Sequence, residues 1–109
     1  MSYCVGDIVY CNFPKTDGSE FQDRTVLLVA QVFGNDVIGC MVTKKKNKFD
    51  PCIEISNDNM ADGFMPFNPS YIRPARISTI DSTKIRRKVG TVKFELLSEV
   101  RQEIRKKFE

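Results

Sequence analysis

The middle of the chain joins a short apolar stretch to a hydroxyl and a cluster of positive charges. Residues 37–42 are mostly apolar, and they are followed by Thr43 and then by four lysines, Lys44, Lys45, Lys46 and Lys48. The apolar stretch is too short for a typical helix and rich in β-branched residues, which favours a buried strand. A rigid strand that ends on a small polar side chain in a positive field can hold a phosphate. We therefore treat this strand end as a candidate site for an anionic substrate.

The residue types that are missing restrict the chemistry of such a site. The chain contains no histidine, the side chain that most often moves protons near neutral pH. Catalysis would have to rest on carboxylates, arginine, lysine, tyrosine or hydroxyls. The four cysteines form no Cys-x-x-Cys pair, and carboxylates do not cluster densely. We expect no metal site and no cofactor, and we expect the cysteines to be small buried residues in a reducing compartment.

Length and composition indicate one domain over residues 1–109. The chain is 41% hydrophobic and 28% charged, which is ordinary for a globular protein. Its net charge is only +3, so an anionic partner must meet a local basic patch. No apolar stretch approaches the roughly 20 residues that span a bilayer, and the first residues lack the pattern of a signal peptide. We expect a cytoplasmic protein that does not contact a membrane.

Positioning the candidate site requires a mainly β fold. Period-2 patterns and apolar stretches predict strands at residues 6–13, 25–32, 36–43, 52–55, 70–80 and 85–92. Arg24 should open the second of these strands, and Pro74 implies that the fifth lies at an edge or contains a bulge. Gly34 and Asn35 should turn the second strand into the third as a hairpin.

Two later segments have a different character. Residues 57–69 mix turn formers with apolar side chains and predict a long loop that exposes Met60, Phe64, Met65 and Phe67. From Phe94 onward, apolar residues recur at spacings of three and four and predict an amphipathic helix whose core stripe is Leu97, Val100, Ile104 and Phe108. The predicted fold class is therefore mainly β with one C-terminal α-helix.

In the order and spacing of its motifs, the chain resembles the MazF/PemK family of toxin endoribonucleases. The resemblance covers nearly the whole chain. Its anchors are GDIVYCNFPKTDGSE at residues 6–20, Arg24 before an apolar strand, Thr43 at the end of the next strand, SYIRPARISTID at residues 70–81, the turn at residues 87–90 and the closing helix. The resemblance implies a small SH3-like β-barrel, a homodimer, and cleavage of single-stranded RNA without a metal ion. It also implies that a cognate antitoxin protein blocks the site.

The resemblance also assigns roles to particular residues. Arg24 stands where family members place an arginine after the first loop, Thr43 where they place Thr or Ser, and Glu20 matches a glutamate that follows Gly-Ser in that loop. We expect these three residues to be catalytic. Lys44, Lys45, Lys46, Ser70 and Arg73 are expected to bind RNA.

The chemistry needs few groups, and each has a plainer interpretation. An arginine can stabilise the extra charge of a phosphorane, threonine can orient the reacting groups, and a carboxylate can take the proton of the 2'-hydroxyl. Without the resemblance, Arg24 would be read as a solvated ion-pair partner, Thr43 as a good β former and Glu20 as a surface glutamate. Some family members carry an acid where this chain has Ala75, so the identity of the general base stays open.

Two other functions compete with RNA cleavage. Proteins on the same fold poison DNA gyrase without cutting anything, but they rely on a C-terminal Trp-Gly-Ile, and this chain contains no tryptophan. A non-catalytic barrel that binds nucleic acid is the other alternative. Cleavage by the 2'-hydroxyl would leave a 2',3'-cyclic phosphate and a 5'-hydroxyl, and this outcome separates the enzyme from both.

Overall fold

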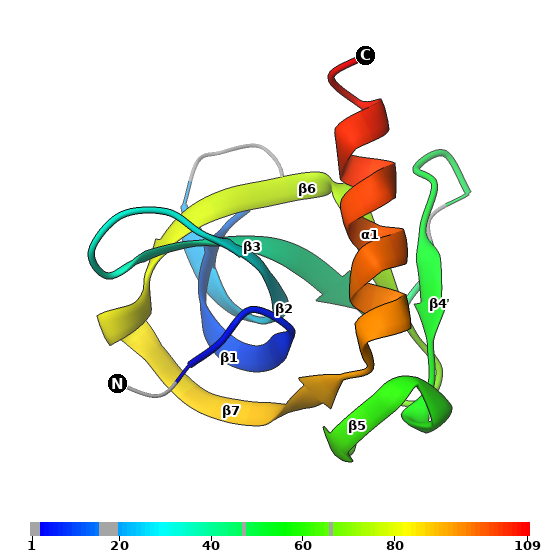
Figure 1. The fold of residues 1–109 in the computed structure, drawn as a ribbon, viewed down its shortest axis with the longest axis horizontal. Coiled ribbons are helices and arrows are strands. Elements are labelled where there is room, and N and C mark those ends of the chain that lie inside the picture. The colour runs from blue at the N-terminus through cyan, green and yellow to red at the C-terminus, as the bar shows by residue number, and fades with distance from the viewer. Residues whose placement is uncertain (1–2, 16–19, 47, 66) are drawn as a thin grey trace.

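One strongly curled antiparallel sheet forms most of the fold, and a helix packs against it (Figure 1). The computed structural model describes residues 3–15, 20–46, 48–65 and 67–109. Within them the strand order is β4-β6-β3-β2-β1-β7-β5. The strands are β1 Asp7–Pro14, β2 Phe21–Gln31, β3 Asp36–Thr43, β4 Ile53–Ile55, β5 Met60–Gly63, β6 Ser70–Asp81 and β7 Ile85–Val92. This half-barrel with a C-terminal helix confirms the predicted fold class.

Alternation along the central strands gives the curled sheet two apolar faces. Ile8 and Leu27 belong to one buried cluster, whereas Val9 and Val26 belong to a second cluster on the opposite face. The second strand is therefore buried on both of its faces. The strand begins at Phe21 rather than at Arg24, because the first residues of β2 pair with the end of β1. Arg24 consequently lies inside the strand, where it pairs with Cys11 of β1, and the pairing of β2 with β3 begins at the next residue, Thr25.

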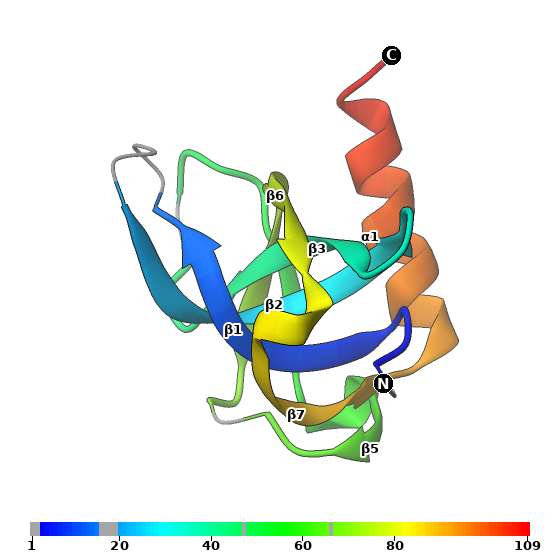
Figure 2. The ribbon, with the colours of Figure 1, turned by 90° about the vertical axis from the view of Figure 1, so that its left-hand side faces the viewer.

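The turn between β2 and β3 has the predicted hairpin form. Gly34 adopts a φ of 62°, a left-handed conformation that glycine tolerates best. The backbone N–H of Asp36 donates to the carbonyl of Phe33 at 3.0 Å, which closes the turn. β3 then runs antiparallel to β2 from the hairpin to Thr43 (Figure 2).

β6 contains the irregularity that Pro74 predicts. Its pairing with β3 jumps from Cys40 opposite Ile77 to Val42 opposite Ile72, so the residues between them bulge. The strand is not at an edge, because it lies between β4 and β3. The bulge absorbs the missing N–H of proline without ending the strand.

The segment predicted as a long exposed loop is partly ordered structure. A short 3-10 helix at Asn57–Asn59 leads into β5, which pairs with β7. Met60 and Met65 are only 8% and 6% exposed and belong to the core, so the prediction that they are exposed was wrong. The aromatic side chains of the segment, Phe64 and Phe67, are exposed as predicted.

Helix α1 Phe94–Lys106 packs across the sheet with the predicted apolar stripe. Leu97 and Val100 are buried, as is Leu96, which the stripe did not include. Phe108 follows the last helical turn and is 78% exposed, so its assignment to the core was wrong. Among the described residues, no helix has the length and apolar character needed to cross a membrane.

Candidate active site

Arg24 lies near the start of β2, and Thr43 is the last residue of the neighbouring strand β3. Thr25 on β2 pairs with Val42 on β3, so the antiparallel register sets the next residues, Arg24 and Thr43, across from each other. Both residues line two adjoining cavities. The sequence-based prediction that they share a site is therefore consistent with the geometry, and the sheet register is what brings them together.

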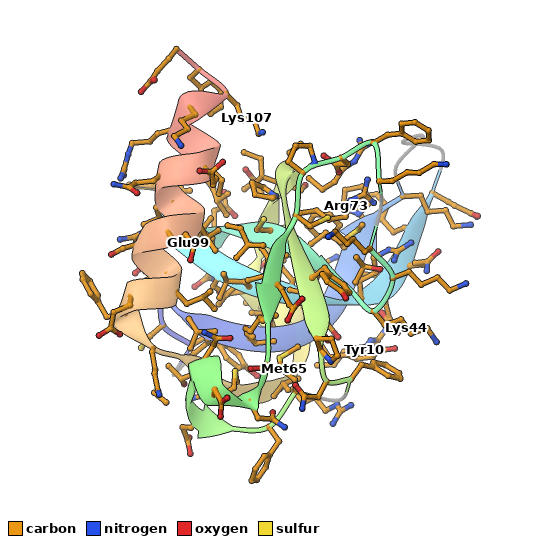
Figure 3. The ribbon with its side chains drawn as sticks, turned by 90° about the vertical axis from the view of Figure 1, so that its right-hand side faces the viewer. Tyr10, Lys44, Met65, Arg73, Glu99 and Lys107 are labelled. Carbon is orange, nitrogen blue, oxygen red and sulfur yellow. The ribbon has the colours of Figure 1, made fainter. Side chains whose placement is uncertain are left out.

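The two cavities are named here for the residues that distinguish them. The aromatic cavity, of about 300 Å³, is lined among others by Tyr10, Asp23, Met65 and Phe67. The basic cavity, of about 580 Å³, is lined among others by Lys46, Lys48, Phe49 and Arg73. Arg24, Thr43 and Lys45 line both cavities and form the wall that the two share. Figure 3 shows Tyr10, Lys44 and Arg73 on the other side of the molecule from helix α1.

The guanidinium of Arg24 has hydrogen-bonding capacity to spare. Its side chain is half-buried, and Nε is shielded from solvent without a hydrogen-bond partner among the described residues. A buried N–H group without a partner costs free energy that a bound acceptor can recover. The charged, forked donors of arginine match the oxygens of a phosphate. The guanidinium of Arg24 can therefore bind an anion.

Thr43 presents its hydroxyl beside this guanidinium. The backbone N–H of Lys45 donates to Oγ1 of Thr43 at 3.3 Å, which fixes the turn that follows β3. This bond uses a lone pair of the hydroxyl oxygen and leaves its hydrogen free to donate. The side chain can therefore offer a hydrogen bond to a group held by Arg24.

The predicted lysines surround the two cavities. Lys44 and Lys45 line the aromatic cavity, and Lys45, Lys46 and Lys48 line the basic one. All four are exposed, so they raise the local positive potential without a desolvation cost. Lys44 places Nζ 4.9 Å from the ring centre of Phe67, a cation–π contact that orients the lysine over the aromatic cavity.

Arg73 faces the basic cavity but is already paired. Its Nε and one terminal nitrogen both lie 2.7 Å from Oδ2 of Asp50. Arg73 is only 9% exposed, and Asp50 neutralises much of its charge. Asp50 was not among the predicted residues. The two residues are 23 positions apart, and no local pattern connects them.

Ser70 and Glu20 occupy less direct positions. Ser70 lines the aromatic cavity, but it is 2% exposed and its hydroxyl donates to the carbonyl of Phe67. This bond holds Phe67 in place and occupies the hydroxyl hydrogen. Glu20 is exposed, forms an ion pair with Lys15, and does not line either cavity.

Sequence reasoning missed an acid and an aromatic side chain that line the same cavity as Arg24. Asp23 lines the aromatic cavity, and its Oδ1 accepts a hydrogen bond from Nε of Arg86 at 3.0 Å. Tyr10 forms another part of the lining, with the guanidinium of Arg87 5.4 Å from its ring centre. Alternation along β1 put Tyr10 on a defined face, which was a usable signal, but nothing in the sequence paired that face with Phe67.

None of the four cysteines lines either cavity. Cys11 and Cys40 are buried as predicted, whereas Cys4 is exposed and Cys52 is half-buried, so the expectation of burial was wrong for these two. Burial, with a smaller effect of Asp23, raises the pKa of Cys11 to about 11. Burial, with a smaller effect of Asp50, raises the pKa of Cys40 to about 12. Both thiols therefore stay protonated near neutral pH. Across the described part of the chain, no group of three or more His, Cys, Asp or Glu residues is arranged to hold a metal ion.

Comparison of the fold with solved structures finds the same architecture in toxin proteins. An endoribonuclease in complex with its cognate antitoxin, from Mycobacterial species, superposes with a TM-score of 0.71 at 13% identity, covering 96% of this chain and 93% of that chain. A MazE-MazF structure from Deinococcus radiodurans gives a TM-score of 0.73 at 15% identity, covering 99% of this chain and 96% of that chain. At such identities the likeness establishes the fold. A comparison with proteins of curated function gave no match.

Sequence comparison with family models extends the relationship beyond the fold. The model that describes the PemK-like, MazF-like toxin of type II toxin-antitoxin systems matches residues 5–108. The match covers both strands that carry Arg24 and Thr43, together with the closing helix. The chain therefore belongs to the family of PemK-like, MazF-like toxins of type II toxin-antitoxin systems.

Proposed function

We propose that this protein is an endoribonuclease that cuts single-stranded RNA without a metal ion, and that a cognate antitoxin blocks it. The observation that carries the proposal is that Arg24 and Thr43, on neighbouring strands, line the same two cavities together with several lysines. Nε of Arg24 also has no hydrogen-bond partner among the described residues. Family membership supports the same conclusion, since one relative of the same fold is an endoribonuclease.

The proposed reaction uses the substrate's own nucleophile. The 2'-hydroxyl oxygen forms a bond to the adjacent phosphorus, the bond from phosphorus to O5' breaks, and a 2',3'-cyclic phosphate and a 5'-hydroxyl result. Arg24 binds the non-bridging oxygens, whose charge grows in the phosphorane-like transition state. Thr43 donates a hydrogen bond that orients the phosphate, and the surrounding lysines hold the flanking backbone.

The two proton transfers require an acceptor and a donor. Glu20 is the carboxylate that we propose as acceptor, because it directly precedes the strand that carries Arg24. Its pairing with Lys15 must open and the side chain must approach the phosphate when RNA binds. The proton that O5' needs can come from the same carboxylic acid or from water.

Antitoxin binding and dimer formation belong to the same proposal. The solved relatives from Deinococcus radiodurans contain MazE together with MazF. In this chain Phe64 and Phe67 are 76% and 53% exposed, and Phe67 lines the aromatic cavity. Large exposed aromatic groups favour a protein partner. We propose a homodimer that binds its antitoxin over the aromatic cavity. A monomeric mass by light scattering at tens of micromolar would contradict the dimer.

The decisive experiment incubates the purified protein with a long single-stranded RNA in EDTA. We expect cleavage with cyclic-phosphate ends and no cleavage of DNA of the same sequence, because DNA lacks the 2'-hydroxyl. Arg24→Ala should slow cleavage by about 100-fold to 1,000-fold with an unchanged melting temperature. Arg105→Ala, an exposed arginine on the helix, is the matched control and should cut normally. Cleavage of an RNA whose 2'-hydroxyl at the cut site is replaced by hydrogen would refute the mechanism.

A further inference from the structure

The aromatic cavity is lined by two aromatic rings, which a site for phosphate alone does not need. The rings of Tyr10 and Phe67 come from β1 and from the segment before β6, and both line the same hollow. A cation accompanies each ring, with Arg87 5.4 Å from the centre of Tyr10 and Lys44 4.9 Å from the centre of Phe67. Phosphate oxygens gain little from aromatic rings, whereas nucleobases stack on them.

The volume and the apolar lining of the aromatic cavity suit one planar group such as a nucleobase. Its volume of about 300 Å³ lies at the lower end of the range for small-molecule sites. Val42 and Met65, 5% and 6% exposed, contribute apolar surface to the lining. Ser70 fixes the backbone of Phe67 through its hydroxyl, so this part of the lining is held in place before any ligand arrives. A preformed apolar slot loses little entropy on binding.

The aromatic cavity also adjoins the proposed phosphate position. Arg24, Thr43 and Lys45 line it and the basic cavity alike. Figure 3 shows Tyr10 and Lys44 close together, with Arg73 of the basic cavity farther along the same side. A nucleotide whose phosphate is bound by Arg24 can therefore place its base in the aromatic cavity while the next backbone segment crosses the lysines.

One polar group in the cavity is placed to read the base. Oδ1 of Asp23 accepts from Arg86, and Oδ2 makes no hydrogen bond with the described residues. An ionised carboxylate only accepts hydrogen bonds. It therefore favours a base that carries an amino group at the position where uracil carries the carbonyl oxygen O4, as adenine and cytosine do.

We propose that the aromatic cavity binds one unpaired RNA base beside the cleaved phosphate, stacked between Tyr10 and Phe67, and that Asp23 selects a base with an amino group over uracil. The inference rests on the proposed function for its substrate, but it makes a claim about binding that does not need cleavage.

Binding can be measured on RNA that cannot be cut. Hexamers of adenine, cytosine or uracil nucleotides with fluorine in place of every 2'-hydroxyl would be titrated at a fixed salt concentration. Tyr10→Ala and Phe67→Ala should each weaken binding of the adenine hexamer by roughly 5-fold to 100-fold, the usual effect of losing one stacked base. Tyr10→Phe keeps the ring, and Phe33→Ala removes a phenylalanine that is 86% exposed on the β2–β3 hairpin. Both controls should bind like the wild type.

The role of Asp23 is read from a ratio of affinities. The wild type should bind the adenine and cytosine hexamers more tightly than the uracil hexamer. Asp23→Asn removes a negative charge and should therefore strengthen binding of every hexamer. The ratio of the affinity for the adenine or cytosine hexamer to the affinity for the uracil hexamer should fall towards one, because the amide also offers donors to uracil. A ratio that is unchanged in Asp23→Asn would overturn the assignment of Asp23. Circular dichroism melting of each variant shows that its fold is retained.

The outcomes separate this inference from the proposed function. If the wild type cuts no RNA but Tyr10→Ala and Phe67→Ala lose hexamer binding, the base site stands and the catalytic proposal fails. If both variants bind all hexamers like the wild type, the base site is refuted even where the wild type cuts RNA. Loss of affinity for an antitoxin peptide alone, with hexamer binding intact, would assign the cavity to a protein partner and also refute the base site.

Discussion

Removing the carboxylate of Asp50 should destabilise the protein more than any surface charge change. Asp50→Ala leaves Nε and a terminal nitrogen of Arg73 without their shared acceptor. The two side chains are only 15% and 11% exposed, so water replaces the lost bonds incompletely. Breaking a buried ion pair from one side costs about 3–5 kcal/mol, and the residual exposure here reduces that to about 2–4 kcal/mol.

Urea unfolding would measure this effect. With a slope of about 2 kcal/mol per molar, the middle of the range for small proteins, the midpoint should fall by about 1–2 M. Glu103→Ala, which breaks the exposed helical pair with Lys106, is the matched control and should leave the midpoint unchanged. The double variant Arg73→Met/Asp50→Ala should be more stable than Asp50→Ala, because it no longer buries an unpaired charge.

Two results would refute this reasoning. An Asp50→Ala midpoint equal to that of the wild type would mean that the ion pair contributes nothing to stability. The loss of unfolding free energy in the double variant could also equal the sum of the losses in Asp50→Ala and Arg73→Met. That result would mean that the two side chains act independently. Asp50→Ala also frees one positive charge in the basic cavity, so the salt dependence of RNA binding should steepen by about one phosphate contact.

Two further predictions concern the core. Gly39→Ala should cost about 1–3 kcal/mol of folding free energy, because the added methyl would meet Ile80 and the stiff, fully buried Val26; an unchanged urea midpoint would contradict this. Burial raises the pKa of Cys11 to about 11 and the pKa of Cys40 to about 12. Below their ordinary pKa of 9.0, the protonated thiols contribute their full stabilisation of the folded state. The free energy of unfolding should therefore fall as the pH rises from about 9 towards 12. Replacing both thiols by alanine should flatten that decline, and an equally steep decline in the variant would assign it to other groups.

Several features of this protein follow from the sequence alone. Residues 85–92 were predicted to the residue as the strand that the structure contains, although the turn expected at residues 87–90 was wrong because these residues lie inside that strand. The helix was predicted from its spacing of apolar residues. Strand alternation and helical periodicity are local properties, and burial reinforces them. The bulge at Pro74 was also predictable, because a proline inside a strand has few other solutions.

The tertiary structure alone decided which distant residues meet. The burial of Met60 depended on the pairing of β5 with β7, and that of Met65 on its packing into the same core cluster; their own segment encodes neither. The same holds for Asp50 beside Arg73 and for Tyr10 beside Phe67, since each contact joins elements far apart in the chain. Register and curl of the sheet set these contacts, and both depend on the sum of many weak interactions across the whole fold rather than on any one stretch of residues.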